Sequence, residues 1–175
     1  MLMLTVATDL DTASVGRLGE LVVEAELLAR GWQAGNFNAT TGNSAGWDIF
    51  AARPGRSLKV RVKAKKPGVS AFRWSARADG SVLKGLSGED ADDVVAAVSF
   101  HSAGGYSIFL IPAFSVETEL RRNHAAYLAE PGRNGAARKD SAMRMIHIDQ
   151  RSAIGHGYAD KWAVYRDNWH ALSGG

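Results

Sequence analysis

The sequence predicts a mixed α/β (α+β) fold in which a central mixed β-sheet is flanked by helices. A helical pattern at about residues 14–30 comes first, and a run of short strand patterns follows between residues 32 and 111. Further helical patterns follow Pro112. With 175 residues, of which 46% are apolar, the chain has the size and composition of one globular domain spanning residues 1–175.

The first helix is predicted from its apolar residues, which recur at intervals of three and four. These residues are Leu18, Leu21, Val22, Ala25, Leu28 and Ala29. Thr12 or Ser14 can supply the N-cap, and Gly31 suits the position after the last turn. We expect this apolar stripe to lie against the sheet.

The strands are predicted from apolar runs and from alternation between apolar and polar residues. They cover about residues 32–38, 47–52, 58–65, 71–75, 93–100 and 106–111. Alternation is strict in residues 58–65, with apolar residues at even positions and Lys or Arg at odd ones. After Pro112, Ser115 can cap a second helix that reaches about Leu128. The helical spacing of Trp162 and Trp169 predicts a C-terminal helix.

Several functional classes are excluded by composition and by missing motifs. Cysteine is absent, so the chain has no disulfide scaffold, zinc ribbon or cysteine nucleophile. The five His residues show no metal-ligand spacing, and no serine-hydrolase, phosphate-loop or dinucleotide-binding motif occurs. The first ten residues lack the basic region of a secretory signal, and no apolar window is long enough to span a membrane. We therefore expect a cytoplasmic protein with no membrane partner.

Positive charge is concentrated in one segment. The net charge is only +3, but residues 49–78 contain no Asp or Glu and nine cations. The cations are Arg53, Arg56, Lys59, Arg61, Lys63, Lys65, Lys66, Arg73 and Arg77. A surface of one sign attracts polyanions, including nucleic acid, through its long-range field and through counterion release. The alternative interpretation is a strand whose charges contact only solvent.

Three residues form a candidate catalytic group: Glu20 on the first helix, Asp48 at the start of a strand, and Lys63 on the next strand. Metal-dependent cleavage of phosphodiesters needs carboxylates that hold Mg²⁺ and a cation that orients or helps to deprotonate the attacking water. Because side chains alternate along a strand, position 61 lies on the same face as Lys63. Position 61 is therefore where a second carboxylate or an amide would face the metal, and the chain has Arg61 there.

These residues lie in four short motifs, which occur in a fixed order along the chain. The motifs run from Gly16 to Glu20, from Leu28 to Trp32, from Gly46 to Phe50 and from Val60 to Lys63. In this order they resemble the PD-(D/E)xK nuclease superfamily, which has the restriction-endonuclease-like fold. The later part of the chain is similar to a group of bacterial single-domain proteins whose front half carries this core.

The resemblance implies a role for each matched residue. Asp48 and Glu20 correspond to ligands of Mg²⁺, and Lys63 corresponds to the catalytic lysine. The nuclease-like core would span about residues 14–112, followed by a C-terminal helical extension over about residues 113–175. Arg61 departs from the pattern, because Glu or Gln is expected there and a guanidinium cannot ligate a cation. As a candidate catalytic residue, Arg61 would instead bind an anion or supply a charge that locks the site.

The sequence thus predicts a Mg²⁺-dependent DNA endonuclease-like protein whose activity is weakened by Arg61. We expect DNA rather than RNA as the partner, and a homodimer as a further possibility. The expected nucleic-acid-binding residues are Arg53, Arg56, Lys59, Lys65, Lys66 and Arg73.

Two alternatives stay open: a catalytically inactive nucleic-acid-binding domain, and a protein-interaction module of a bacterial defence or toxin system. An ion pair of Arg61 with Asp48 or Glu20 would favour the inactive binding domain. A further carboxylate at the metal position, such as Glu24, would favour the enzyme. A large exposed apolar patch without a basic groove would favour the interaction module.

Overall fold

The fold is built on a five-stranded mixed sheet. The computed structural model describes residues 4–7, 9–37, 46–86, 92–148 and 161–172. The strands of the sheet are β1 (Gln33–Asn36), β2 (Ile49–Arg53), β3 (Arg56–Lys65), β5 (Val94–Phe100) and β6 (Tyr106–Pro112). Their order is β1-β2-β3-β5-β6, and every neighbouring pair is antiparallel except β3 and β5, which are parallel. The predicted mixed α+β fold class is confirmed.

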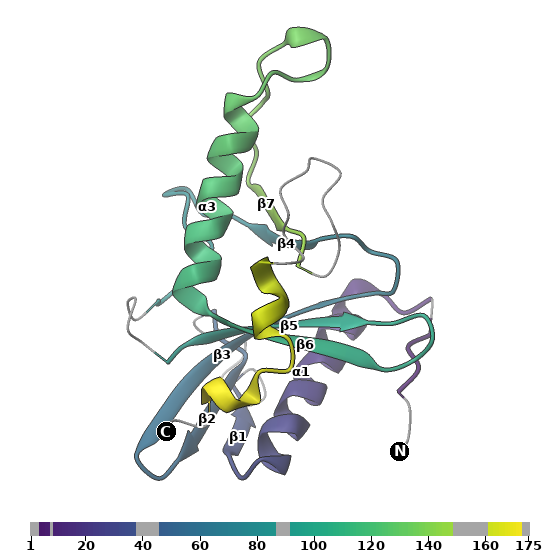
Figure 1. Ribbon diagram of the computed structural model, residues 1–175, viewed down its shortest axis with the longest axis vertical. Helices are drawn as coiled ribbons and strands as arrows, with labels where there is room; N and C mark the ends of the chain where they lie inside the picture. The colour runs from purple at the N-terminus through teal and green to yellow at the C-terminus, as the bar shows by residue number, and fades with distance from the viewer. Residues whose placement is uncertain (1–3, 8, 38–45, 87–91, 149–160, 173–175) are drawn as a thin grey trace.

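Helices cover both faces of this sheet (Figure 1). Helix α1 (Thr12–Ala29) packs on one face. Helix α3 (Ala113–Ala129) packs on the other, together with an antiparallel pair of short strands, β4 (Phe72–Ser75) and β7 (Met143–Ile146). All six predicted strands are present, and β7 is a seventh that the sequence did not predict. Within the described residues, no helix is long and apolar enough to cross a membrane.

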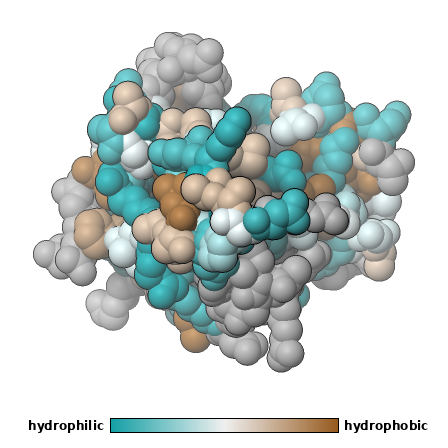
Figure 2. Space-filling model, turned by 90° about the horizontal axis from the view of Figure 1, so that it is seen from above, coloured by the Kyte–Doolittle hydropathy of each residue, from teal (hydrophilic) through white to brown (hydrophobic). Residues whose placement is uncertain are grey.

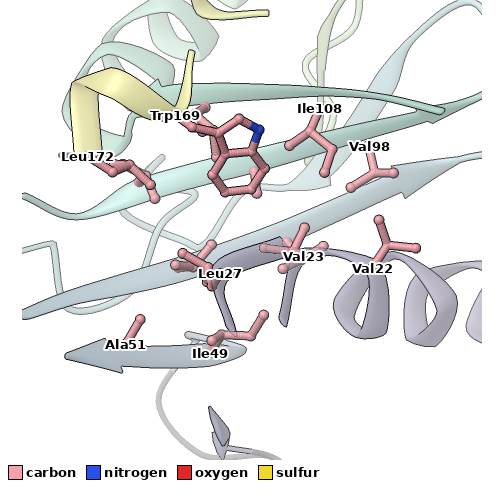
Figure 3. Packing of buried hydrophobic residues seen from close by; sticks show 14 of the residues in the cluster. Val22, Val23, Leu27, Ile49, Ala51, Val98, Ile108, Trp169 and Leu172 are labelled. Atoms are coloured by element: carbon pink, nitrogen blue, oxygen red, sulfur yellow. The ribbon is translucent and has the colours of Figure 1, made fainter. Parts of the chain in front are cut away.

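Two apolar cores result, one on each side of the sheet. Alternate residues of β5 divide between them: Val94, Ala96 and Val98 face the α1 side, and Val95 and Ala97 face the α3 side. This explains why all seven residues of β5 are buried. Figure 3 shows the core on the α1 side. Viewed from above, the outer surface is mainly hydrophilic, with smaller hydrophobic areas between (Figure 2).

Helix α1 presents a different stripe to the sheet from the one predicted. The buried residues are Val15, Gly19, Val22, Val23 and Leu27. Leu21, Ala25 and Leu28, which were expected to be buried, are exposed. The close contact of the helix with the sheet is centred on Gly19, because a Cβ built on this residue would lie only 2.6 Å from Cβ of Ala64.

The ends of the helices also differ from the prediction in detail. Asp11, rather than Thr12 or Ser14, is the N-cap of α1, and its Oδ1 accepts a hydrogen bond from the Ser14 N–H at 2.7 Å. Gly31 follows the last turn with φ of +79°, as predicted. Helix α3 starts directly after Pro112, two residues before the predicted cap at Ser115, and its N-terminus has no side-chain cap.

The predicted C-terminal helix is wrong. Residues 161–162 are helical, but two short 3₁₀ turns follow, Ala163–Tyr165 and Trp169–Leu172, instead of a continuous helix. Between them Asp167 has φ of +50°, donates its N–H to the Ile108 carbonyl at 2.7 Å, and so attaches the segment to the outer edge of β6. Trp162 consequently lies in the core on the α3 side and Trp169 in the core on the α1 side. One straight helix could not place both.

The contact at Gly19 predicts opposite outcomes for two glycines of the same helix. Gly16→Ala should stabilise the protein by about 1 kcal/mol, because a Cβ at Gly16 meets no atom within 4 Å and Ala favours helix. Gly19→Ala gains the same propensity but must displace β3, at a cost of about 1–3 kcal/mol. Urea unfolding should therefore rank the two variants with Gly19→Ala clearly less stable. Equal stabilities would show that the helix does not depend on this contact.

Candidate functional site

Asp48 is a buried carboxylate with both oxygens occupied. It precedes β2, and its N–H donates to the Val60 carbonyl at 2.9 Å, which extends the pairing of β2 with β3. Its Oδ2 accepts from the Val62 N–H at 2.7 Å, and its Oδ1 accepts from Nη1 of Arg61 at 3.0 Å. The Asp48 side chain is only 6% exposed. Asp48 is thus both part of the strand pairing and one half of an ion pair.

Arg61 supplies the positive charge that compensates this carboxylate. A buried carboxylate requires a cation or several hydrogen bonds, because burial removes its hydration. In the resemblance-based prediction that cation was Mg²⁺, with Asp48 as a ligand. In the structure, the guanidinium of Arg61 is the cation beside Oδ1 of Asp48. This is the ion pair that the sequence analysis identified as favouring an inactive binding domain.

The residues present do not fit a Mg²⁺ site in this arrangement. Within the part of the chain that the structure describes, no three His, Cys, Asp or Glu side chains are grouped as a metal site requires. Glu24 therefore does not complete such a group with Glu20 and Asp48. Mg²⁺ also prefers near-octahedral oxygen ligands, and a guanidinium offers only donors.

Glu20 on α1 contacts the sheet through Asn36, a residue that the sequence did not identify as part of the site. Its Oε2 accepts from Nδ2 of Asn36 at 2.8 Å and from Nη1 of Arg17 at 2.9 Å. Asn36 lies on β1 opposite Ile49, the residue after Asp48. The Phe37 N–H also donates to the Asp48 carbonyl at 2.8 Å. Through Asn36, the structure therefore places Glu20 at the same end of the sheet as Asp48.

Lys63 belongs to the same electrostatic group as Asp48 and Arg61. Burial lowers the pKa of the Lys63 ammonium, the neighbouring Arg61 lowers it further, and Asp48 opposes both effects. Its Nζ lies 5.9 Å from the ring centre of Trp74 on β4. Arg61 and Lys63 therefore share the β3 face that looks towards the β4–β7 pair, as alternation predicted, while Val62 points into the core on the α1 side.

Two of the predicted nucleic-acid-binding cations, Arg53 and Arg56, lie at the turn of the β2–β3 hairpin and contact other parts of the chain. Arg56 forms a double hydrogen bond with Asp92, at 2.7 and 2.6 Å. Arg53 donates to the Leu172 carbonyl at 2.8 Å and stacks 4.5 Å from the ring centre of Trp32. Both cations tie the hairpin to other parts of the same chain.

Two more cations pack on aromatic rings along β3. Lys59 lies 4.9 Å from the ring centre of Trp47 and forms an ion pair with Asp93 at 3.1 Å. Lys65 is buried, lies 5.5 Å from the ring centre of Phe72, and donates to a loop carbonyl at 2.6 Å. Three cations of the acid-free segment, Arg56, Lys59 and Arg61, are therefore paired with acids from outside it, which a count of charges along the sequence could not show.

The remaining cations of the segment lie closer to solvent. Arg73 and Arg77 are exposed, and Lys66 is half-buried. Whether any of the six predicted binding residues contacts nucleic acid stays a prediction.

Comparison with known proteins gives structural similarities only. No protein-family model matches the chain, and no curated protein matches it by sequence. Among solved structures it is similar to the bacterial homing endonuclease I-Ssp6803I, with 16% sequence identity, a TM-score of 0.47, and coverage of 93% of this chain and 92% of that one. It is also similar to MepB, with 8% identity, a TM-score of 0.37, and coverage of 84% and 93% respectively. Neither similarity assigns a role to a residue of this chain.

Because the pKa of Lys63 is lowered, a variant without its charge should gain stability, and this gain should depend on pH. A lysine whose pKa is lower in the folded than in the unfolded state costs stability below its folded pKa, and this cost disappears as pH rises to the unfolded value. Lys63→Met should therefore be more stable than the parent at neutral pH, and the difference should shrink as pH approaches about 10.4, the ordinary lysine value. Urea unfolding at several pH values measures this. A difference that stays constant or grows with pH would contradict the assignment.

Proposed function

We propose that this protein is a DNA-binding relative of the PD-(D/E)xK nucleases in which an arginine replaces the catalytic metal. The ion pair between Arg61 and Asp48 carries the proposal. DNA rather than RNA, and the superfamily itself, follow from the resemblance of the four sequence motifs. The parent chain is then a binding protein first, with phosphodiester cleavage weak or absent.

Electrostatics support the view that Arg61 and a metal exclude each other. Two unit charges 4 Å apart interact with about 4 kcal/mol at an effective dielectric of 20, and the double charge of Mg²⁺ makes the repulsion by Arg61 about 8 kcal/mol. The guanidinium cannot relieve this by losing its proton. Arg61 would have to leave, and would leave the buried Asp48 carboxylate without its counter-charge until the metal bound.

The placement of the other residues that the resemblance assigns to a cleavage centre supports descent from a nuclease. Glu20 and Asp48 lie at the same end of the sheet, and Lys63 is electrostatically coupled to Asp48. Lys63 is held on the rigid strand β3 beside Arg61. A single change at position 61 is therefore the smallest change that could restore metal binding.

Binding and cleavage can be separated in one experiment with supercoiled plasmid. The parent should bind the plasmid at low salt, and each neutralised phosphate should contribute about −0.9 to the slope of log affinity against log salt. With Mg²⁺ or Mn²⁺ it should nick the plasmid weakly or not at all. Arg61→Glu places a carboxylate where the superfamily has one, so nicking should appear or increase, and adding Asp48→Ala should abolish it.

Arg77→Glu is the matched control, because it makes the same charge change at an exposed cation of the same segment. It should leave nicking as weak as in the parent. Robust cleavage by the parent that disappears in Arg61→Glu would contradict the proposal, and would mean that Arg61 acts on the scissile phosphate. A parent that does not bind plasmid at low salt would contradict DNA binding itself.

A further inference from the structure

The β4–β7 pair has one face in the core and one face open to solvent. Its inner side chains, among them Phe72, Trp74 and Ile146, are buried against α3 and the sheet. Its outer face is formed by Arg73, Ser75, Met143 and Met145, all of which are exposed. The register places Arg73 opposite Met145 and Ser75 opposite Met143, so these four side chains form one compact patch. We call this patch the ribbon face.

The ribbon face combines a cation with apolar groups and contains no acid. Met143 is 50% exposed and Met145 42%, which is high for large apolar side chains. The guanidinium of Arg73 forms no hydrogen bond or ion pair with any residue in the described ranges. The acids nearest in sequence, Asp79 and Asp140, accept hydrogen bonds from Ser81 and His124. The patch therefore has positive charge available to an anionic partner.

We propose that the ribbon face lies in the major groove of duplex DNA. This inference rests on the proposed function and names the element that contacts the bases. A two-stranded ribbon fits the major groove, which is about 12 Å wide, and four residues per strand extend for about 13 Å. Arg73 matches the paired acceptors of guanine, Ser75 can donate or accept, and the methionines offer apolar contact to thymine methyl groups.

The inner side of the ribbon fixes the place of the ribbon face in the fold. Trp74, next to Arg73 along β4, packs against Lys63 of the candidate site, so the ribbon is anchored beside that site. Figure 1 shows the ribbon alongside α3, on the side of the sheet away from α1. Its buried inner face holds it in place, which reduces the entropy that binding would cost.

A second copy of this chain fits the ribbon face less well. A stable dimer buries about 800 Å² per partner, and four side chains are too small a patch for that. Two copies meeting around a two-fold axis would also bring the two Arg73 charges together, with no acid in the patch to compensate them. Self-association is therefore the outcome to test against DNA binding.

The test compares duplex binding of Arg73→Gln, Met145→Glu and Leu28→Glu by fluorescence anisotropy. Leu28 is the matched control, because it is an apolar side chain 51% exposed on the outer face of α1. Arg73→Gln should weaken binding by about 5- to 150-fold, the range for a bidentate contact to a base. Met145→Glu should also weaken binding, since it places a carboxylate in the groove, while Leu28→Glu should bind as the parent does.

A modified duplex tests the groove directly. Replacing guanine by 7-deazaguanine removes the N7 acceptor from the major groove and should weaken binding by the parent. The same replacement should have little further effect on Arg73→Gln. If Met145→Glu fails to fold, as judged by circular dichroism, Met145→Gln replaces it in the comparison.

The outcomes separate this inference from the proposed function. If the parent binds duplex DNA and both ribbon variants bind equally well, the ribbon assignment is wrong and DNA binding stands. If the parent binds no duplex at low salt, both the ribbon assignment and the proposed DNA binding are wrong. If Met145→Glu changes only the sedimentation of the protein, from dimer to monomer, the ribbon face is a contact between copies and the inference is overturned.

Discussion

The ion pair between Asp48 and Arg61 fixes both the pairing of β2 with β3 and the charge at this end of the sheet. Asp48 accepts from the backbone of β3 as well as from Arg61, so the same carboxylate holds β2 to β3 and neutralises the arginine. Removing one partner of a buried pair usually costs about 3–5 kcal/mol, because the other charge remains buried without compensation. Under the proposed function, the arginine that compensates Asp48 in the fold also occupies the place of the metal beside this carboxylate.

The surrounding elements follow from this arrangement. The β2–β3 hairpin lies inside the sheet rather than at its edge, and Trp47, Phe72 and Trp74 cover its polar face. Lysines on that face pack their ammonium groups over these rings, an interaction that stabilises partly desolvated cations. On the opposite face α1 approaches closely at Gly19, which brings Glu20 within hydrogen-bond distance of β1.

Much of the sheet could be predicted because strands have a strict period of two. The alternation of residues 58–65 identified which side chains enter the core, and it correctly placed Arg61 beside Lys63. The helical stripe was less well defined, since Leu21 and Leu28 fit the spacing as well as Val23 and Leu27 do. The buried face contains the close contact between Gly19 and Ala64, and that contact joins residues 45 positions apart.

The candidate site, too, could be predicted only in part from the sequence. Glu20, Asp48 and Lys63 were identified from short motifs, but the part played by Asn36 depends on strand register, for which the sequence carries no local signal. The acid-free segment was visible as a run of cations, whereas its pairing with Asp92 and Asp93 depends on the sheet order. The C-terminal segment was misjudged because Trp162 and Trp169 have helical spacing yet enter different cores.

Calorimetric titration of Mg²⁺ into the parent and into Arg61→Gln tests most directly whether the arginine stands in for a metal. Glutamine keeps a donor near Asp48 and adds a carbonyl oxygen that can ligate the ion. The account predicts no measurable Mg²⁺ binding to the parent or to the control Arg77→Gln, and binding to Arg61→Gln that disappears when Asp48 is replaced by Asn. Binding of equal strength to the parent and to Arg61→Gln would contradict it.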